Sequence, residues 1–170
     1  MLIDDLKRIA KELLVRDGYH QPLFFLCIGE HIIGQPLPTA MFNKLFREEL
    51  NAEDFKTQAV FSMGLLAKKL NANRLIMIWD AAMRVLPGTK PDDVDVTEHP
   101  LQYPRSMRTE CLIFNDISFV TGKDVTHIIP YKGGAGEPVE FLESKIPEGA
   151  GVESRFTDLA MEGYNKGEPL

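Results

Sequence analysis

Residues 22–33 read PLFFLCIGEHII, and this stretch decides the fold. Residues 22–28 form a nearly continuous apolar run that is too short for a core helix and rich in Phe and Leu, which predicts a strand buried on both faces. Gly29 and Glu30 follow, and Gly at the first central position is what a type II′ hairpin turn requires. Residues 31–33 then return as a short second strand. The stretch therefore predicts an antiparallel hairpin inside a sheet that helices must cover.

Amphipathic spacing predicts two long helices and a short C-terminal one. Residues 2–16 place apolar side chains on one stripe and most charged side chains opposite, and Gly18 is suited to the left-handed conformation that ends a helix. A second long helix is expected from Asn51 to about Leu70, and a short one after Ser154. The stripe of the second helix that is expected to face the core consists of Phe55, Ala59, Met63, Leu66, Ala67 and Leu70.

The remaining strands complete an α+β domain. Residues 75–79 form another apolar strand, and residues 107–119 and 124–129 are expected to pair as antiparallel strands. We therefore predict one globular domain over residues 1–170, with a mostly antiparallel sheet of about five strands packed by the two long helices. Residues 87–104 are a long Pro- and Asp-containing loop, and residues 132–151 are an irregular Gly- and Pro-rich connector.

Composition narrows the class of protein. The 170 residues are 44% hydrophobic and 26% charged, as in ordinary globular proteins, and no apolar run approaches the length of a membrane span. The N-terminus carries Asp4 and Asp5 where a secretory signal has positive charge. Cys27 and Cys111 lie inside apolar segments and are expected to be buried and reduced. These features predict a soluble cytoplasmic protein that does not bind a membrane.

The charge balance and the missing motifs argue against several functional classes. A net charge of −6, with the basic residues scattered, makes nucleic-acid binding unfavourable because phosphate contacts need a concentrated basic face. The chain contains no GxGxxG, GxxxxGK[ST], CxxC, HExxH or GxSxG motif. No cofactor and no metal site are therefore predicted. A site assembled from residues that are distant in the sequence stays open.

The densest polar cluster lies where the long loop meets the next strand. Arg108 and Glu110 are two residues apart in that strand, so they should project from the same face. We assign His99 and Glu110 as candidate acid/base groups, and Tyr103, Arg105 and Arg108 as candidate ligand-binding groups for a small anion. The alternative is a solvated start of a strand with a salt bridge at its rim.

Other chemistry-bearing residues favour structural roles. The acidic residues Asp92, Asp93 and Asp95 could bind a hard cation, but their spacing lacks the glycine and the distal glutamate of a calcium loop, so a solvated acidic loop is the preferred interpretation. Asp80 ends an apolar strand, where it either enters a cleft or caps the strand. Three histidines lie beside strands without a local partner for a metal site: His20, His31 and His127.

Three functional hypotheses follow. The leading one is a non-catalytic binding or assembly protein, because the chain supplies a complete core and no catalytic motif. The Pro- and Gly-rich segments and residues 131–134 are a candidate strand edge for self-association, and the alternative is that the final helix covers this edge. The second is an enzyme that acts on a small anionic or phosphorylated substrate through the His99 and Glu110 cluster. The third is a metal-assisted nuclease or phosphohydrolase that uses Asp80, Glu110 and the Asp92–Asp95 cluster.

Overall fold

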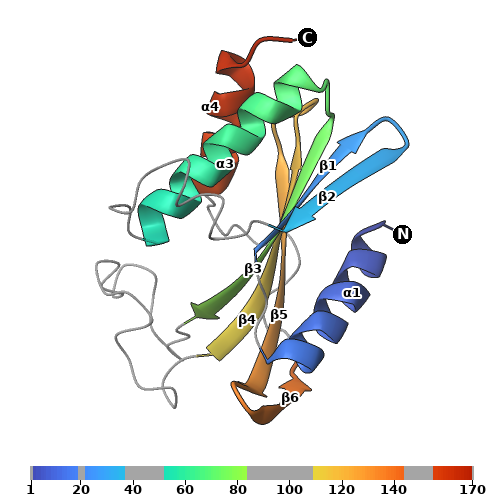
Figure 1. Ribbon diagram of the computed structural model, residues 1–170, viewed down its shortest axis with the longest axis vertical. Coiled ribbons are helices and arrows are strands. Elements are labelled where there is room, and N and C mark those ends of the chain that lie inside the picture. The colour runs from blue at the N-terminus through green and yellow to red at the C-terminus, as the bar shows by residue number, and fades with distance from the viewer. Residues whose placement is uncertain (1, 19–21, 37–51, 84–108, 144–154, 170) are drawn as a thin grey trace. The chain divides into compact units, whose positions relative to one another are not determined.

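The computed structural model describes residues 2–18, 22–36, 52–83, 109–143 and 155–169. Within them the chain forms an α+β fold in which the strands occur in the order β2-β1-β3-β4-β5-β6 in one sheet (Figure 1). The elements are α1 (Leu2–Asp17), β1 (Leu23–Ile28), β2 (His31–Pro36), α3 (Ala52–Lys69), β3 (Arg74–Met83), β4 (Thr109–Ser118), β5 (Asp124–Gly134), β6 (Glu137–Phe141) and α4 (Arg155–Lys166).

The predicted α+β class is confirmed, and two details of the prediction are wrong. The sheet has six strands instead of about five. The described helices contain 16, 18 and 12 residues, so they are three full helices and not two long ones with a short terminal piece. The loop predicted at residues 87–104 lies outside the described residues.

The chain divides into two compact units, and each is described separately. Unit 1 contains residues 1–20, 79–113 and 128–146, whereas unit 2 contains residues 21–78, 114–127 and 147–170. Strands β3, β4 and β5 contribute residues to both units. The sequence-based assignment of a single domain stays a prediction.

In unit 2 the hairpin forms as the sequence predicts. Strands β1 and β2 pair antiparallel over six residue pairs, from Leu23 with Pro36 to Ile28 with His31. Gly29 has a φ of 58°, which fits the left-handed first position of a type II′ turn. The other edge of β1 pairs with β3, also antiparallel. This double pairing places Phe24 and Leu26 in the core, where each is only 1% exposed.

Small residues bring α3 and α4 into close contact in unit 2. A Cβ added at Gly64 would overlap the carbonyl oxygen of Ala160, and one at Gly163 would overlap the carbonyl oxygen of Phe61. The stripe of α3 that is buried therefore follows Val60, Gly64 and Ala67.

The predicted inward stripe of α3 is consequently wrong at Leu66. That side chain is 39% exposed, although its hydrophobicity and spacing place it in the core. The physical reason is that backbone contact between helices needs residues with little or no side chain, so the buried face is marked by small residues. Of the remaining predicted stripe, Ala59 and Ala67 are buried, as predicted.

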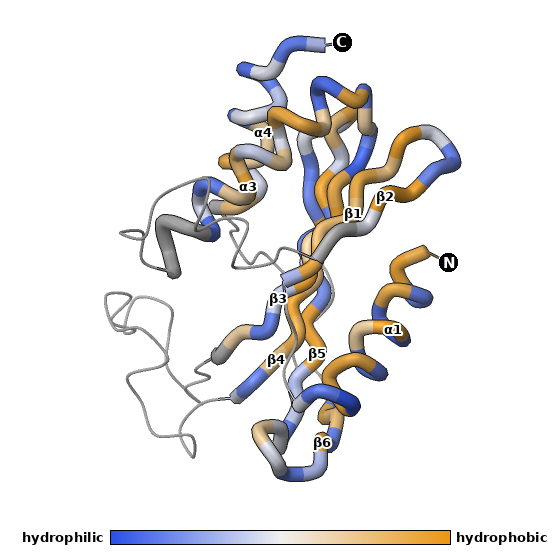
Figure 2. Tube along the Cα trace, in the orientation of Figure 1, coloured by the Kyte–Doolittle hydropathy of each residue, from blue (hydrophilic) through white to orange (hydrophobic). Residues whose placement is uncertain are grey.

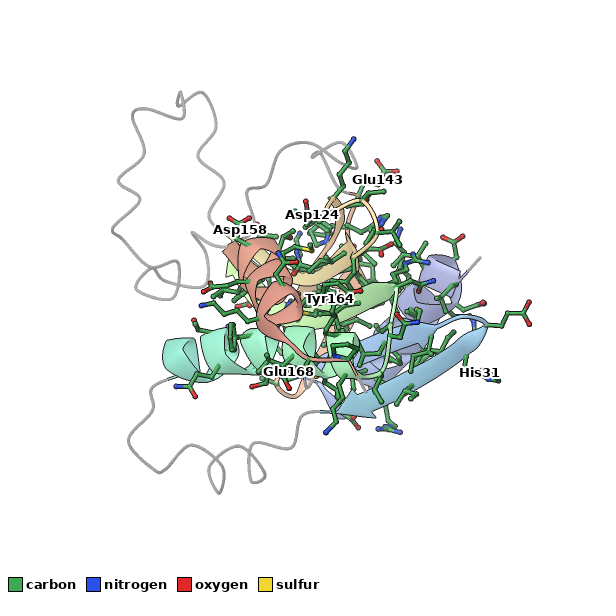
Figure 3. All side chains as sticks on the ribbon, turned by 90° about the horizontal axis from the view of Figure 1, so that it is seen from above. His31, Asp124, Glu143, Asp158, Tyr164 and Glu168 are labelled. Atoms are coloured by element: carbon green, nitrogen blue, oxygen red, sulfur yellow. The ribbon has the colours of Figure 1, made fainter. Side chains whose placement is uncertain are left out.

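Helix α4 also contacts the strands of unit 2. The Thr157 hydroxyl donates a hydrogen bond of 2.8 Å to the Asp124 carboxylate at the start of β5. The Tyr164 ring stacks on Phe119 with a centroid distance of 4.4 Å, and Figure 3 shows Tyr164 on the side of α4 that faces the strands. Lys68 of α3 places its ammonium 4.7 Å from the centre of the same tyrosine ring.

In unit 1 the predicted first helix and its end are confirmed. Leu6, Ala10 and Leu14 form the buried stripe of α1, and Figure 2 shows hydrophobic and hydrophilic residues alternating along this helix. Gly18 has a φ of 75° and its amide donates to the Leu14 carbonyl at 2.8 Å, as in a helix C-cap. The Gly18 carbonyl then accepts a hydrogen bond of 3.1 Å from the Ala135 amide.

Strand β6 lies in the segment 132–151, where the sequence indicates an irregular connector. It pairs antiparallel with β5, with a register shift between Lys132 and Gly134. The residues that made the segment look irregular form the turn itself, because Gly134, Ala135 and Gly136 all have positive φ. Helix α1 packs beside this strand, where the Lys11 ammonium lies 5.1 Å from the centre of the Phe141 ring.

Cys27 and Cys111 are both free and buried, as predicted. No helix in the described parts of the chain is long and apolar enough to cross a membrane.

Candidate functional site

Most of the cluster predicted from the sequence lies outside the described residues. This applies to the candidate groups His99, Tyr103, Arg105 and Arg108. The remaining member, Glu110, is the second residue of β4 and is half-buried. Glu110 is therefore the one predicted site residue that lies within the described ranges.

Glu110 belongs to a group of polar side chains in unit 1, which we call the Tyr131 cluster and define as Asp80, Glu110, Cys111 and Tyr131. The Tyr131 hydroxyl donates a short hydrogen bond of 2.6 Å to an Asp80 carboxylate oxygen. Strands β3 and β5 lie on either side of β4, so this bond links two strands that are not neighbours. On β4, the Cys111 thiol donates to the Ala81 carbonyl at 3.4 Å.

The electrostatics of the Tyr131 cluster keep its weak acids protonated. Burial raises the pKa of the Tyr131 hydroxyl, and its hydrogen bond to Asp80 and the charges of Asp80 and Glu110 raise this pKa further. Burial likewise raises the pKa of the Cys111 thiol to about 12, with smaller contributions from the same two carboxylates. Tyr131 therefore acts as a hydrogen-bond donor, and Cys111 is not a thiolate nucleophile at neutral pH.

This cluster has the wrong charge to hold an anion by itself. Its described members are two carboxylates, a neutral hydroxyl and a neutral thiol, and none of them is a cation. The predicted anion site would depend entirely on the arginines Arg105 and Arg108, which lie outside the described residues. The assignment of an anion-binding enzyme stays a prediction.

The residues proposed for metal chemistry form no group in the described ranges. No set of three or more His, Cys, Asp or Glu side chains in these ranges is arranged to hold a metal ion. The acidic residues Asp92 to Asp95 and the imidazole of His20 lie outside the described residues. His127 is buried in β5, whereas His31 is exposed at the start of β2 (Figure 3).

An ion pair in unit 2 has no counterpart among the features predicted from the sequence. The Arg74 guanidinium, at the start of β3, donates two hydrogen bonds of 2.6 and 2.5 Å to the carboxylate of Asp116 on β4. Strand β4 continues through Asp116 to Ser118. The two residues are 42 positions apart in the chain, so no local pattern could have revealed the pair.

A groove between the two helices of unit 2 is a further candidate. It has a volume of about 420 Å³ and is lined by Thr57, Gln58, Phe61, Ser62 and Leu65 of α3 and by Leu159 of α4. None of these residues carries a charge, so the groove does not suit an anionic substrate.

The two edges of the sheet differ in how they are protected against pairing. Strand β6 contains Glu137, Pro138 and Glu140, all exposed, and a register shift separates it from regular pairing with β5. Acidic side chains, proline and an irregular strand are the devices that keep an edge from recruiting another strand. Helix α1 contacts the same strand.

Strand β2 has few of these devices. Its sequence, HIIGQP, contains no Asp, Glu, Lys or Arg, and its pairing with β1 has no register shift. Ile32 and Ile33 are 47% and 44% exposed, and among the described residues no strand pairs with the outer side of β2. Pro36 at the end of the strand is its single residue that cannot donate a backbone hydrogen bond. We call this outer side, residues 31–36, the β2 edge.

No protein-family model, no curated protein and no solved structure matches the chain.

Proposed function

We propose that this chain is a non-catalytic binding or assembly protein, and that the β2 edge is its binding element. The observation that carries the proposal is the contrast between the two edges of one sheet. The β6 edge has acidic side chains, a proline and a register shift, whereas the β2 edge is regular, uncharged and partly apolar. An edge of that kind either recruits a strand or makes the protein prone to aggregation.

Strand addition explains how such an edge would bind. Backbone N–H and C=O groups on the outer side of an edge strand form the same ladder with an added strand as with a neighbour in the sheet. Exposed side chains on the edge then set the preference for apolar side chains on the added strand. The exposed Ile32 and Ile33 favour an uncharged, β-branched partner segment.

The enzyme hypothesis has weaker support. Its candidate residue Glu110 lies near the Asp80 carboxylate and the protonated Tyr131 hydroxyl. The two carboxylates would repel an anion, and the hydroxyl would offer it only one hydrogen-bond donor. The Tyr131 cluster has a simpler role, because a buried hydroxyl and its carboxylate partner cross-link β3 and β5 in unit 1.

A peptide-binding experiment tests the proposal. A short fluorescein-labelled peptide of alternating Thr and Val residues should bind the protein saturably in an anisotropy titration, while the same peptide with proline at every second position should not bind. Ile33→Lys should abolish binding, because lysine on an edge opposes strand addition.

Val125→Lys is the matched control. Val125 is 44% exposed, as Ile33 is, but it lies on β5 and not on the β2 edge. Both variants should keep their stability within about 0.5 kcal/mol of the wild type, because both sites are at the surface. If the wild type binds no strand-forming peptide and also does not self-associate, the proposal is wrong. If Val125→Lys weakens binding as much as Ile33→Lys, the β2 edge is not the binding element.

A further inference from the structure

We infer that the β2 edge binds the β2 edge of a second copy of this chain, antiparallel, with the two-fold axis at Ile33. The inference rests on the proposed function, because it names the partner of the same edge. It follows from the positions of the outward backbone groups, from the side chains they would bring together, and from the absence of charge in the sequence of β2.

The hairpin turn fixes which backbone groups of β2 point outward. A β-turn brings the first residue's carbonyl to the fourth residue's amide, which pairs Ile28 with His31. Because hydrogen-bonding direction alternates along a strand, the backbone groups of His31, Ile33 and Gln35 point to β1. Those of Ile32 and Gly34 therefore point outward.

One symmetric register uses all of these groups. With the two-fold axis at Ile33, Ile32 of one copy faces Gly34 of the second copy, and Gly34 faces Ile32. Each of these pairs exchanges two backbone hydrogen bonds, so every outward N–H and C=O group of Ile32 and Gly34 finds a partner. With the axis one position away, at Ile32 or at Gly34, only the residue on the axis would face a residue whose backbone N–H and C=O groups also point outward.

The same register gives a favourable match of side chains. Gly34 lies opposite Phe25 in the hairpin, and a Cβ at Gly34 would meet the Phe25 ring at 2.5 to 2.7 Å. The aromatic ring therefore fills the space above the glycine, and Ile32 of the second copy would pack beside it. On the other face, Ile33 would meet Ile33 of the second copy, next to the buried Leu26.

Charge favours this surface over the rest of the protein for self-association. The chain carries a net charge of −6, so two copies repel each other over most approaches. The sequence of β2 has no Asp, Glu, Lys or Arg, and in this register Glu30 faces Pro36 of the second copy and not another carboxylate. No like charges would face each other across the new pair of strands.

The size of the contact sets its strength and its limit. A pairing of two short strands buries less than the roughly 1,200 Å² of a standard interface, so we expect a weak dimer whose population depends on protein concentration. Further strand addition at β6 is opposed by its acidic side chains, its proline and its register shift with β5.

Sedimentation equilibrium of the full chain tests for the dimer. The wild type and Val125→Lys should show a concentration-dependent monomer–dimer equilibrium. Ile33→Lys should raise the dissociation constant by about 10-fold or more, because it removes the Ile33 pair and places two ammonium groups opposite each other at the axis. A wild type that stays monomeric up to millimolar concentration would overturn the inference. In that case, continued binding of the Thr-Val peptide would leave the proposed function standing.

Cysteine cross-linking tests the register. In a pair without hydrogen bonds the Cα atoms lie about 4.5 Å apart, which suits a disulfide. Ile33→Cys should therefore form covalent dimers rapidly on mild oxidation. Ile32→Cys should form them slowly, because the two positions would be about 8 Å apart diagonally. Cys27 lies opposite Ile32 in a pair without hydrogen bonds, so all variants are made in a Cys27→Ala background to prevent an intramolecular disulfide, and Cys111 is buried. Faster cross-linking of Ile32→Cys, or equal cross-linking of a Val125→Cys control, would overturn the register.

Discussion

Replacing Gly64 by Ala in α3 is expected to destabilise the protein, although helix propensity alone predicts the opposite. Glycine in the interior of a helix costs about 1 kcal/mol relative to alanine, so an isolated helix would gain that amount. In the folded protein, however, the new Cβ would overlap the Ala160 carbonyl oxygen and lie 2.8 Å from the Tyr164 amide nitrogen. The sign of the effect thus distinguishes local propensity from tertiary packing.

The magnitude follows from what the added methyl group would meet. Its neighbours are backbone atoms of α4, which cannot rotate away as a side chain can. The helices must separate, and overpacking of this kind costs typically about 1–3 kcal/mol, sometimes more. A packing cost of about 3 kcal/mol, less the gain of about 1 kcal/mol in helix propensity, leaves a net loss of about 2 kcal/mol in the free energy of unfolding. For a domain of this size the loss corresponds to a fall in Tm of roughly 4–8 °C.

Urea unfolding measures this loss. The single tryptophan, Trp79, is buried in β3 and reports on unfolding through its fluorescence. Gly163→Ala should give a similar loss, because its Cβ would overlap the Phe61 carbonyl oxygen on the other helix. Ser62→Ala, on the same helix as Gly64 but facing the groove, should change stability by less than about 0.5 kcal/mol. If Gly64→Ala instead raises stability by about 1 kcal/mol, the close approach of α3 and α4 is refuted.

Three further predictions concern single side chains. Leu66→Ala should lower the free energy of unfolding in urea by less than about 1 kcal/mol, because this side chain is well exposed. A loss of about 2 kcal/mol or more would mean that Leu66 is buried in the core. Arg74→Lys should cost about 1.5–3 kcal/mol, because lysine cannot form the two parallel hydrogen bonds to Asp116, and a double-mutant cycle with Asp116→Asn should show a clear coupling energy. The pKa of the Cys111 thiol is raised in the folded state to about 12. The contribution of this thiol to the free energy of unfolding is therefore fully present below about pH 9, and it falls by up to about 1.4 kcal/mol per pH unit between pH 9 and 12. Tyr131, whose pKa is also raised, adds to this fall. The difference between wild type and Cys111→Val unfolding at pH 8 and 10.5 isolates this fall, and a pH-independent difference would contradict the raised pKa.

The candidate site could be predicted only in part. Glu110 was identified because polar residues cluster near it in the sequence, but its neighbours Asp80 and Tyr131 come from two other strands. Their hydrogen bond joins residues 51 positions apart, and nothing in the local pattern of either strand indicates it. The contrast between the two sheet edges was equally hidden, because the order of strands in a sheet cannot be derived from their hydrophobic patterns.

The sequence by itself determined the elements whose signals are local. The turn at Gly29, the helix end at Gly18 and the buried strand before the turn all depend on residues within one or two turns of chain, where glycine conformation and apolar periodicity act directly. Only the tertiary structure decided which face of α3 is buried and where the sixth strand pairs. Those outcomes depend on contacts between distant segments: Gly64 is buried because α4 approaches it, and β6 is a strand because β5 supplies its hydrogen-bond partners.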